Sequence, residues 1–119
     1  MEQAEVVTYK YEVSAEQMVR FHLLSYTHMN AIELTKGDMN ALVLLALRGT
    51  PTLIDFCDEL VKRQIYLSLG SARNAIGELC TEKNLIVKTG NYKKKVSLSP
   101  AINLSLKHNT LLSINCLLR

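Results

Sequence analysis

The sequence contains no tryptophan, two phenylalanines, two prolines and three cysteines in 119 residues. With so few large aromatics, aliphatic side chains must fill the core, and the length suits one compact domain with short attachments. The cysteines (Cys57, Cys80 and Cys116) are odd in number and widely spaced, which argues against a secreted disulfide framework.

Several functional signatures are also missing. The longest apolar run, residues 41–47, is too short to cross a bilayer, and the N-terminus lacks the basic and apolar segments of a signal peptide. We therefore expect a cytoplasmic protein that does not contact membranes. No phosphate-binding loop, G-x-G-x-x-G motif or nucleophile–base arrangement is present, so no enzymatic activity, cofactor or small-molecule substrate is predicted. His22 and His28 are six residues apart, unlike a metal-binding i, i+4 pair, and no metal site is expected.

The charges that are present are unevenly distributed. Residues 1–61 carry four Lys/Arg and nine Asp/Glu, whereas residues 62–95 carry eight Lys/Arg and two Asp/Glu. The formal net charge of +3 hides this asymmetry. A basic block in the second half of a chain indicates a polyanionic partner for that half.

The N-terminal segment predicts a strand followed by a helix. Apolar and polar residues alternate over residues 6–13, the period of a strand. Ser14 and Gln17 have the spacing of a capping box, which begins a helix that we expect to end between residues 30 and 33. Its candidate buried residues are Met18, Val19, Leu23, Tyr26 and Met29.

Three more helices are predicted from capping residues and apolar periodicity. Thr35 and Asp38 have capping spacing and begin the first of these three helices, and Gly49 ends it. Thr52 caps the second of them. Residues 64–67 interrupt the pattern, and Ser68 or Gly70 opens the third, with Asn84 as its stop. The residues expected to be buried are Met39, Leu42, Val43 and Leu45–Leu47 in the first helix, Leu53, Ile54, Phe56, Cys57, Leu60 and Val61 in the second, and Ala72, Ala75, Ile76, Leu79 and Cys80 in the third.

A hairpin and an ambiguous tail complete the chain. Residues 85–89 and 92–99 are predicted as strands joined by a Gly90-Asn91 turn and closed by Pro100. In the tail, Ile102, Leu104 and Leu106 alternate like a strand, as do the apolar residues of 112–118. Residues 111, 114 and 118 fit a helix nearly as well, and a strand is weakly favoured there.

The order helix, helix, turn, helix, strand, turn, strand over residues 35–99 resembles winged helix-turn-helix proteins of the bacterial transcription-regulator type. The stretch SARNAIGELCTEKNLIVKTGNYKKKVSL is similar to their recognition helix and wing. Residues 85–100 and the following AINL also resemble plasmid replication proteins of the Firmicute type, although Ser99-Pro100 stands where those often have Asn-Pro. The resemblance implies an α+β, mainly α, winged helix with a three-helix core and a β-hairpin wing.

The candidate DNA-binding residues follow from the chemistry of a duplex. A recognition helix needs short polar side chains on its outer face, and asparagine or arginine can read base edges in the major groove. Lysines crowded on one hairpin repel each other unless an anion such as phosphate lies between them. The predicted site is Ser68, Ser71, Arg73, Asn74, Lys88, Tyr92, Lys93, Lys94 and Lys95. Alternatively, the lysines protect an edge strand and the helix face is simply solvated.

We expect sequence-specific binding of double-stranded DNA in transcriptional regulation. The alternatives are a replication or maintenance protein of a plasmid or mobile element, and a winged-helix protein-interaction module.

The chain divides into an N-terminal strand and helix (1–34), a winged-helix domain (35–100) and a tail (101–119). Residues 1–34 and the tail either form a homodimer interface, with the tail pairing against the first strand, or complete the monomer core.

Overall fold

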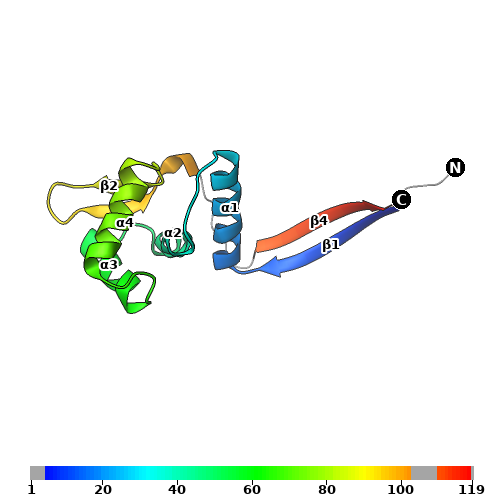
Figure 1. Cartoon of the computed structure of the whole chain (residues 1–119). Coiled ribbons are helices and arrows are strands. Elements are labelled where there is room, and N and C mark those ends of the chain that lie inside the picture. Colours follow the sequence, from blue (N-terminus) through cyan, green and yellow to red (C-terminus); the bar gives the residue numbers. More distant parts are fainter. Residues whose placement is uncertain (1–4, 103–109, 119) are drawn as a thin grey trace.

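Four helices and two antiparallel strand pairs make up the structure, a computed structural model that describes residues 5–102 and 110–118 (Figure 1). The helices are α1 (Ala15–Met29), α2 (Lys36–Arg48), α3 (Leu53–Lys62) and α4 (Leu69–Thr81). The strands are β1 (Glu5–Val13), β2 (Ile86–Thr89), β3 (Lys95–Leu98) and β4 (Thr110–Leu118), with a short 3-10 helix at Pro100–Ile102. The predicted class, α+β and mainly helical, is confirmed.

Each helix begins at the hydroxyl residue that the sequence indicates. Ser14, Thr35, Thr52 and Ser68 each accept a hydrogen bond from the backbone N–H three residues later, at 3.1–3.2 Å. At Ser14 the capping box is complete, because the Gln17 side chain accepts the Ser14 backbone N–H in return. The choice between Ser68 and Gly70 is thereby resolved in favour of Ser68. Such caps fix helix starts locally, since they satisfy backbone donors that lack a partner within the helix.

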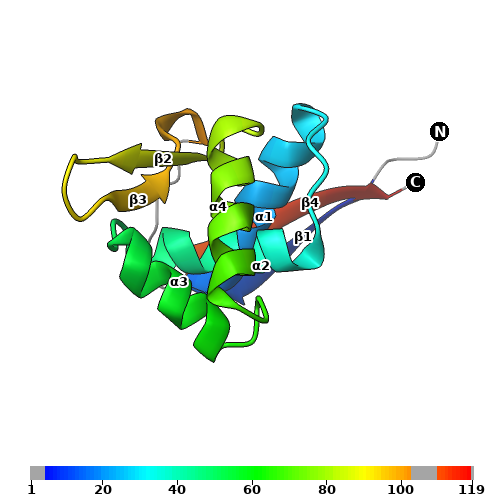
Figure 2. The same ribbon diagram turned by 60° about the vertical axis from the view of Figure 1, so that its left-hand side comes forward.

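The core lies between the helices and the inner side of the β2–β3 hairpin (Figure 2). Helix α2 contributes a nearly continuous buried run from Ala41 to Leu45, and it contacts both α1 and β3. The largest fully buried side chains are Leu23 of α1, Leu42 and Leu45 of α2, Phe56 and Leu60 of α3, Ile76 and Leu79 of α4, and Leu85 before β2. This packing holds α4 and the hairpin against the same three-helix body.

Three residues predicted as buried are exposed. Met29 is 83% exposed at the end of α1, Ile54 is 58% exposed in the first turn of α3, and Leu47 is 38% exposed near the end of α2. Periodicity gives the direction in which a helix faces its neighbours, but helix ends extend beyond the element that covers them. These three predictions were wrong for that reason.

The predicted return strand of the hairpin is shorter than expected. Strands β2 and β3 pair from Ile86↔Leu98 to Thr89↔Lys95, which leaves residues 90–94 as a five-residue loop. The prediction of strand at residues 92–94 was therefore wrong. Gly90 and Lys93 have φ values of +93° and +52°, a left-handed conformation that an extended strand does not adopt.

The hairpin is also joined to α3 by its backbone. The Leu53 N–H donates to the Lys94 carbonyl at 2.8 Å, and the Val96 N–H donates to the Pro51 carbonyl at 2.9 Å. Thr52 and Lys95 form an isolated antiparallel bridge between these bonds. The start of α3 thus acts as a third, very short strand beside β3, which fixes the hairpin loop relative to α3.

Strands β1 and β4 form a separate two-stranded ribbon that extends away from the helices (Figure 1). The tail is thus a strand over residues 110–118, as favoured from the sequence, and it pairs with the N-terminal strand, which was one of the two alternatives left open. Ile102 instead lies in the 3-10 helix, which corrects its assignment to a strand, and Leu104 and Leu106 are outside the described residues. The radius of gyration is 17.7 Å, compared with about 13.5 Å for a compact chain of this length.

Among the described residues, no helix has both the length and the apolar character needed to cross a membrane.

An ion-pair cluster joins α2 to α3 on the surface. The Arg48 guanidinium donates to both Glu59 carboxylate oxygens at 2.7–3.2 Å, and Arg63 donates to the same carboxylate at 3.0 Å. The hydrogen bond from Arg48 is the main cause that lowers the Glu59 pKa below its ordinary value of 4.5. The pair therefore stabilises the fold above that value, and this contribution is lost as the pH falls through the lowered pKa.

We expect Glu59→Gln to lower the urea midpoint modestly at pH 7, with the difference from the parent shrinking below pH 4.5. Unfolding curves between pH 3 and 7 measure this. Glu16→Gln, which removes a single longer contact of 3.6 Å to Arg20, is the control and should change little. A difference that stays constant with pH would contradict the role of the Glu59 charge.

Candidate nucleic-acid interface

The outer side of α4 presents its polar residues to solvent. Ser71, Arg73 and Asn74 are all exposed and lie in the first half of the helix. Ser68 is exposed too, but its hydroxyl caps the helix and donates to the Ser71 hydroxyl at 3.0 Å. Arg73 and Asn74 are thus the exposed polar side chains at the start of α4 that form none of the described hydrogen bonds.

The hairpin presents its cations around the loop at residues 90–94. Lys93 and Lys94 are exposed within the loop, while Lys88 and Lys95 are exposed on the flanking strands β2 and β3. Tyr92 is 85% exposed, and the Lys93 ammonium nitrogen lies 6.0 Å from the centroid of its ring. The Tyr92 ring and hydroxyl are therefore accessible from outside the molecule.

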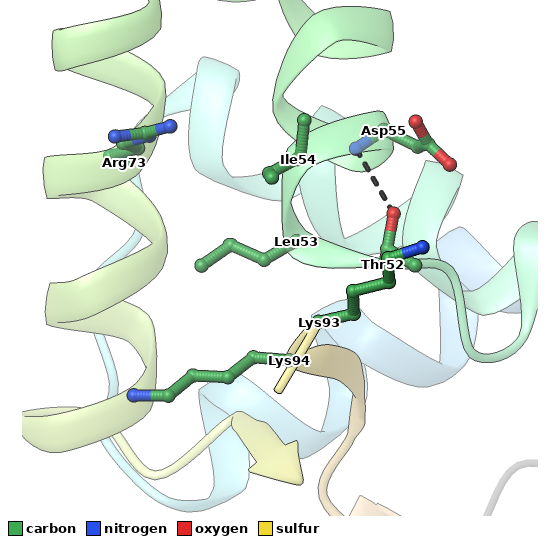
Figure 3. A pocket seen from close by; sticks show the side chains of 7 residues that line it. All are labelled: Thr52, Leu53, Ile54, Asp55, Arg73, Lys93 and Lys94. Atoms are coloured by element: carbon green, nitrogen blue, oxygen red, sulfur yellow. Dashed lines mark hydrogen bonds between the residues drawn. The ribbon is translucent and has the colours of Figure 1, made fainter. Parts of the chain in front are cut away.

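A groove of about 460 Å³ runs between α4 and the hairpin loop (Figure 3). Arg73 lines it from α4, and Lys93 and Lys94 line it from the loop. The start of α3 forms its floor with Leu53 and Ile54, and Asp55 adds one carboxylate to the lining. Figure 3 shows Lys94 extending from the loop toward α4, so cations reach this hollow from both sides.

Lys88 is exposed on β2 and lies outside the groove lining. Burial raises the pKa of the Cys57 thiol in α3, and the positive charges of Arg73 and Lys88 oppose this shift. The groove lining itself holds three cations and the Asp55 carboxylate, so its net charge is positive and favours a bound anion.

The structure unites part of the predicted site and separates the rest. Arg73, Lys93 and Lys94 line one groove, whereas Ser71 and Asn74 lie on α4 outside its lining and Ser68 serves as a cap. Sequence reasoning missed the groove floor at residues 52–55. The signal was weak, because Leu53 and Ile54 read as ordinary core residues of an amphipathic helix.

A tyrosine fixes the connection that precedes α4. The Tyr66 hydroxyl donates to a carboxylate oxygen of Asp38 at 2.7 Å, in a partly buried site between that connection and the start of α2. Burial and the Asp38 carboxylate both raise the Tyr66 pKa, so the phenol stays protonated and keeps donating. This bond lies two residues before the Ser68 cap and so anchors the N-terminal end of α4.

We expect Tyr66→Phe to lower the free energy of unfolding by about 1–2 kcal/mol, because a hydrogen bond to a charged acceptor is lost in a partly buried site. Urea unfolding at pH 7 measures this. The same substitution at exposed Tyr92 removes no described intramolecular hydrogen bond and should change stability by less than about 0.5 kcal/mol. Equal stabilities of Tyr66→Phe and the parent would contradict an anchoring role.

Within residues 5–102 and 110–118, no group of three or more His, Cys, Asp or Glu side chains could hold a metal ion.

Comparisons of the chain with protein-family models, with curated proteins and with solved structures found no match. The fold and the candidate site thus define the chain as a mainly helical α+β protein with a cationic groove between a helix and a hairpin.

Proposed function

We propose that the protein binds double-stranded DNA in a sequence-specific manner, as a winged helix-turn-helix transcriptional regulator that acts in the cytoplasm without a cofactor. Helix α4 would enter the major groove, and the loop between β2 and β3 would contact the adjacent backbone or minor groove. The order α2, α3, α4, β2, β3 is compatible with this fold, and supports the proposal. Free thiols at Cys57 and Cys80 suit a reducing compartment.

The main support for the proposal is the arrangement of three cations around one groove. Arg73 of α4 and the loop lysines Lys93 and Lys94 lie around a single groove rather than on unrelated faces. A duplex presents parallel lines of phosphates on either side of its grooves, and cations on a helix and on a hairpin beside it can neutralise both. A surface of lysines that protects an edge strand would not require an arginine from another element at the same hollow.

The rest of α4 fits the chemistry of base recognition. Recognition helices contact base edges through residues in their N-terminal part, which here is where Ser71 and Asn74 lie. The asparagine amide can donate one hydrogen bond to adenine N7 and accept one from the adenine N6 amino group at the same time. Gly77, where an added Cβ would meet open space, leaves a low point in the middle of α4.

The direct test is to select duplexes from a random pool with the purified protein and to measure their affinity by fluorescence anisotropy. DNA binding predicts enrichment of one sequence and a linear fall of log affinity with log salt concentration. The absence of enrichment, together with no affinity for any duplex at 50 mM salt, would contradict the proposal. A replication or maintenance role on a plasmid or mobile element uses the same contacts and differs in the site selected.

The groove floor favours one second candidate. Ile54 is mostly exposed and lies with Leu53 between the cations, which is the composition of a site for an acidic, partly apolar protein segment. Under this alternative, the protein has no affinity for duplex DNA even at 50 mM salt, and it binds acidic peptides that contain apolar residues. Duplex titrations at low salt therefore separate the two candidates.

A further inference from the structure

The β1–β4 ribbon has two different faces. In its register Val7 lies opposite Cys116, Tyr9 opposite Ile114 and Tyr11 opposite Leu112. Residues opposite each other, and those two positions further along, lie on the same face of an antiparallel pair. One face therefore holds Val7, Tyr9, Tyr11, Val13, Leu112, Ile114 and Cys116, with Glu5, Leu118 and Thr110 at its ends.

The opposite face is polar along its centre. There Thr8 pairs with Asn115 and Lys10 with Ser113, while Glu12 lies opposite Leu111 and the apolar pair of Val6 and Leu117 lies at one end. The ribbon is thus amphipathic by register, with an apolar face that carries its one charged residue, Glu5, at an end. Such alternation is the pattern of a sheet that buries one face and leaves the other in water.

No described part of the same chain covers the apolar face. The ribbon projects from the helical body, and within residues 5–102 and 110–118 no helix packs extensively against either strand (Figure 1). Isolated two-stranded ribbons are marginally stable in water at best, and independent stability needs packing against further structure. A ribbon of nine paired residues with an apolar face therefore calls for a partner surface.

We propose that the partner is a second copy of this chain, whose ribbon packs its apolar face against the same face of the first around a two-fold axis. A two-fold interface uses the same patch twice, so it must be self-complementary and free of charge near the axis. This face meets that condition, because Tyr9 and Ile114 lie at its centre and Glu5 lies at its end. Lys10 and Glu12 remain on the solvent side of the pair.

The area is sufficient for a stable dimer. At about 150 Å² for each tyrosine and about 80 Å² for each aliphatic or cysteine side chain, the face provides about 700 Å² per copy. The total of about 1,400 Å² lies within the range of specific protein–protein interfaces, about 1,200–2,000 Å². The ribbon and the hairpin loop lie at opposite ends of the helical body (Figure 1). A dimer formed through the ribbon therefore leaves the cationic groove accessible.

Sedimentation velocity of the full chain at 1–100 µM, without DNA, tests the proposal separately from the proposed function. We expect a species of twice the 13.4 kDa chain mass. Tyr9→Lys should weaken the dimer at least about 100-fold, because the charge enters a central apolar position twice. Ile114→Lys, the cross-strand partner, should weaken it similarly from the other strand.

Thr8→Lys is the matched control, because it adds the same charge one residue away on the polar face, and it should change the dissociation constant less than about threefold. Circular dichroism and urea unfolding verify that the helical body is unchanged in all variants. The proposal is overturned by a monomeric parent at 100 µM, by a Tyr9→Lys dimer as tight as the parent, or by Thr8→Lys disrupting the dimer as strongly as Tyr9→Lys.

Discussion

Replacing Lys93, Lys94 and Lys95 together by alanine is expected to lower the affinity for every duplex and to flatten its salt dependence. Each lysine–phosphate contact contributes about 0.9 to the slope of log affinity against log salt, so three contacts contribute about 2.7. If the parent and the variant converge near 1 M salt, the affinity loss at 0.1 M is on the order of several hundredfold. Anisotropy titrations at five or more salt concentrations measure both quantities.

The expected loss is the same for selected and unrelated duplexes, because phosphates carry no base identity. Lys83→Ala is the matched control. Lys83 follows the C-terminal end of α4, and its ammonium donates to the Glu33 carbonyl, away from the groove that the loop lysines line. It should leave the slope unchanged. A triple variant with the parental slope would place the phosphate contacts elsewhere on the protein.

Asn74→Ala is expected to weaken binding to the selected duplex by about 1–3 kcal/mol, or about 5- to 150-fold, and to leave binding to unrelated duplexes unchanged. Asn74 is exposed, and no described hydrogen bond within the chain engages its amide, so its removal should not affect folding. Competition titrations with selected and scrambled duplexes measure the change in specificity. The slope against salt should remain parental.

Thr81→Ala is the control on the same helix. The Thr81 hydroxyl donates to the Gly77 carbonyl at 2.9 Å, which occupies it, and it lies at the C-terminal end of α4. Thr81 shares a helical face with Ser71 and Asn74, which makes it a matched position. We expect its replacement to leave affinity for the selected duplex within about twofold. If Asn74→Ala lost affinity equally on all duplexes, asparagine would be a backbone contact instead.

Helix starts were predictable because capping is local. Ser14, Thr35, Thr52 and Ser68 each bond to a backbone N–H three residues ahead, and this geometry depends on few residues outside the cap. A strand in the tail was also weakly favoured in advance, because its apolar residues alternate with period two. Its pairing with the N-terminal strand was one of two alternatives that the sequence left open. The dimer, the domain boundaries and the DNA site remain predictions.

The groove could not be predicted, because it depends on contacts between distant segments. It unites residues 52–55, Arg73 and residues 93–94, and the bond from the Leu53 N–H to the Lys94 carbonyl fixes the loop beside α3. The same bond and the positive φ of Lys93 explain why the return strand begins at residue 95 rather than 92. Alternation of residue types contains no information on which partner a strand end will meet.

The central claim is that α4 and the hairpin contact one duplex through one surface. Titrating the ¹⁵N-labelled protein with its selected duplex and mapping the amide shifts tests it most directly. We expect the largest amide shifts at residues 68–75 and 88–95, and small shifts at the exposed residues of α1. Large shifts confined to α1, or a hairpin loop that does not respond while α4 does, would contradict it.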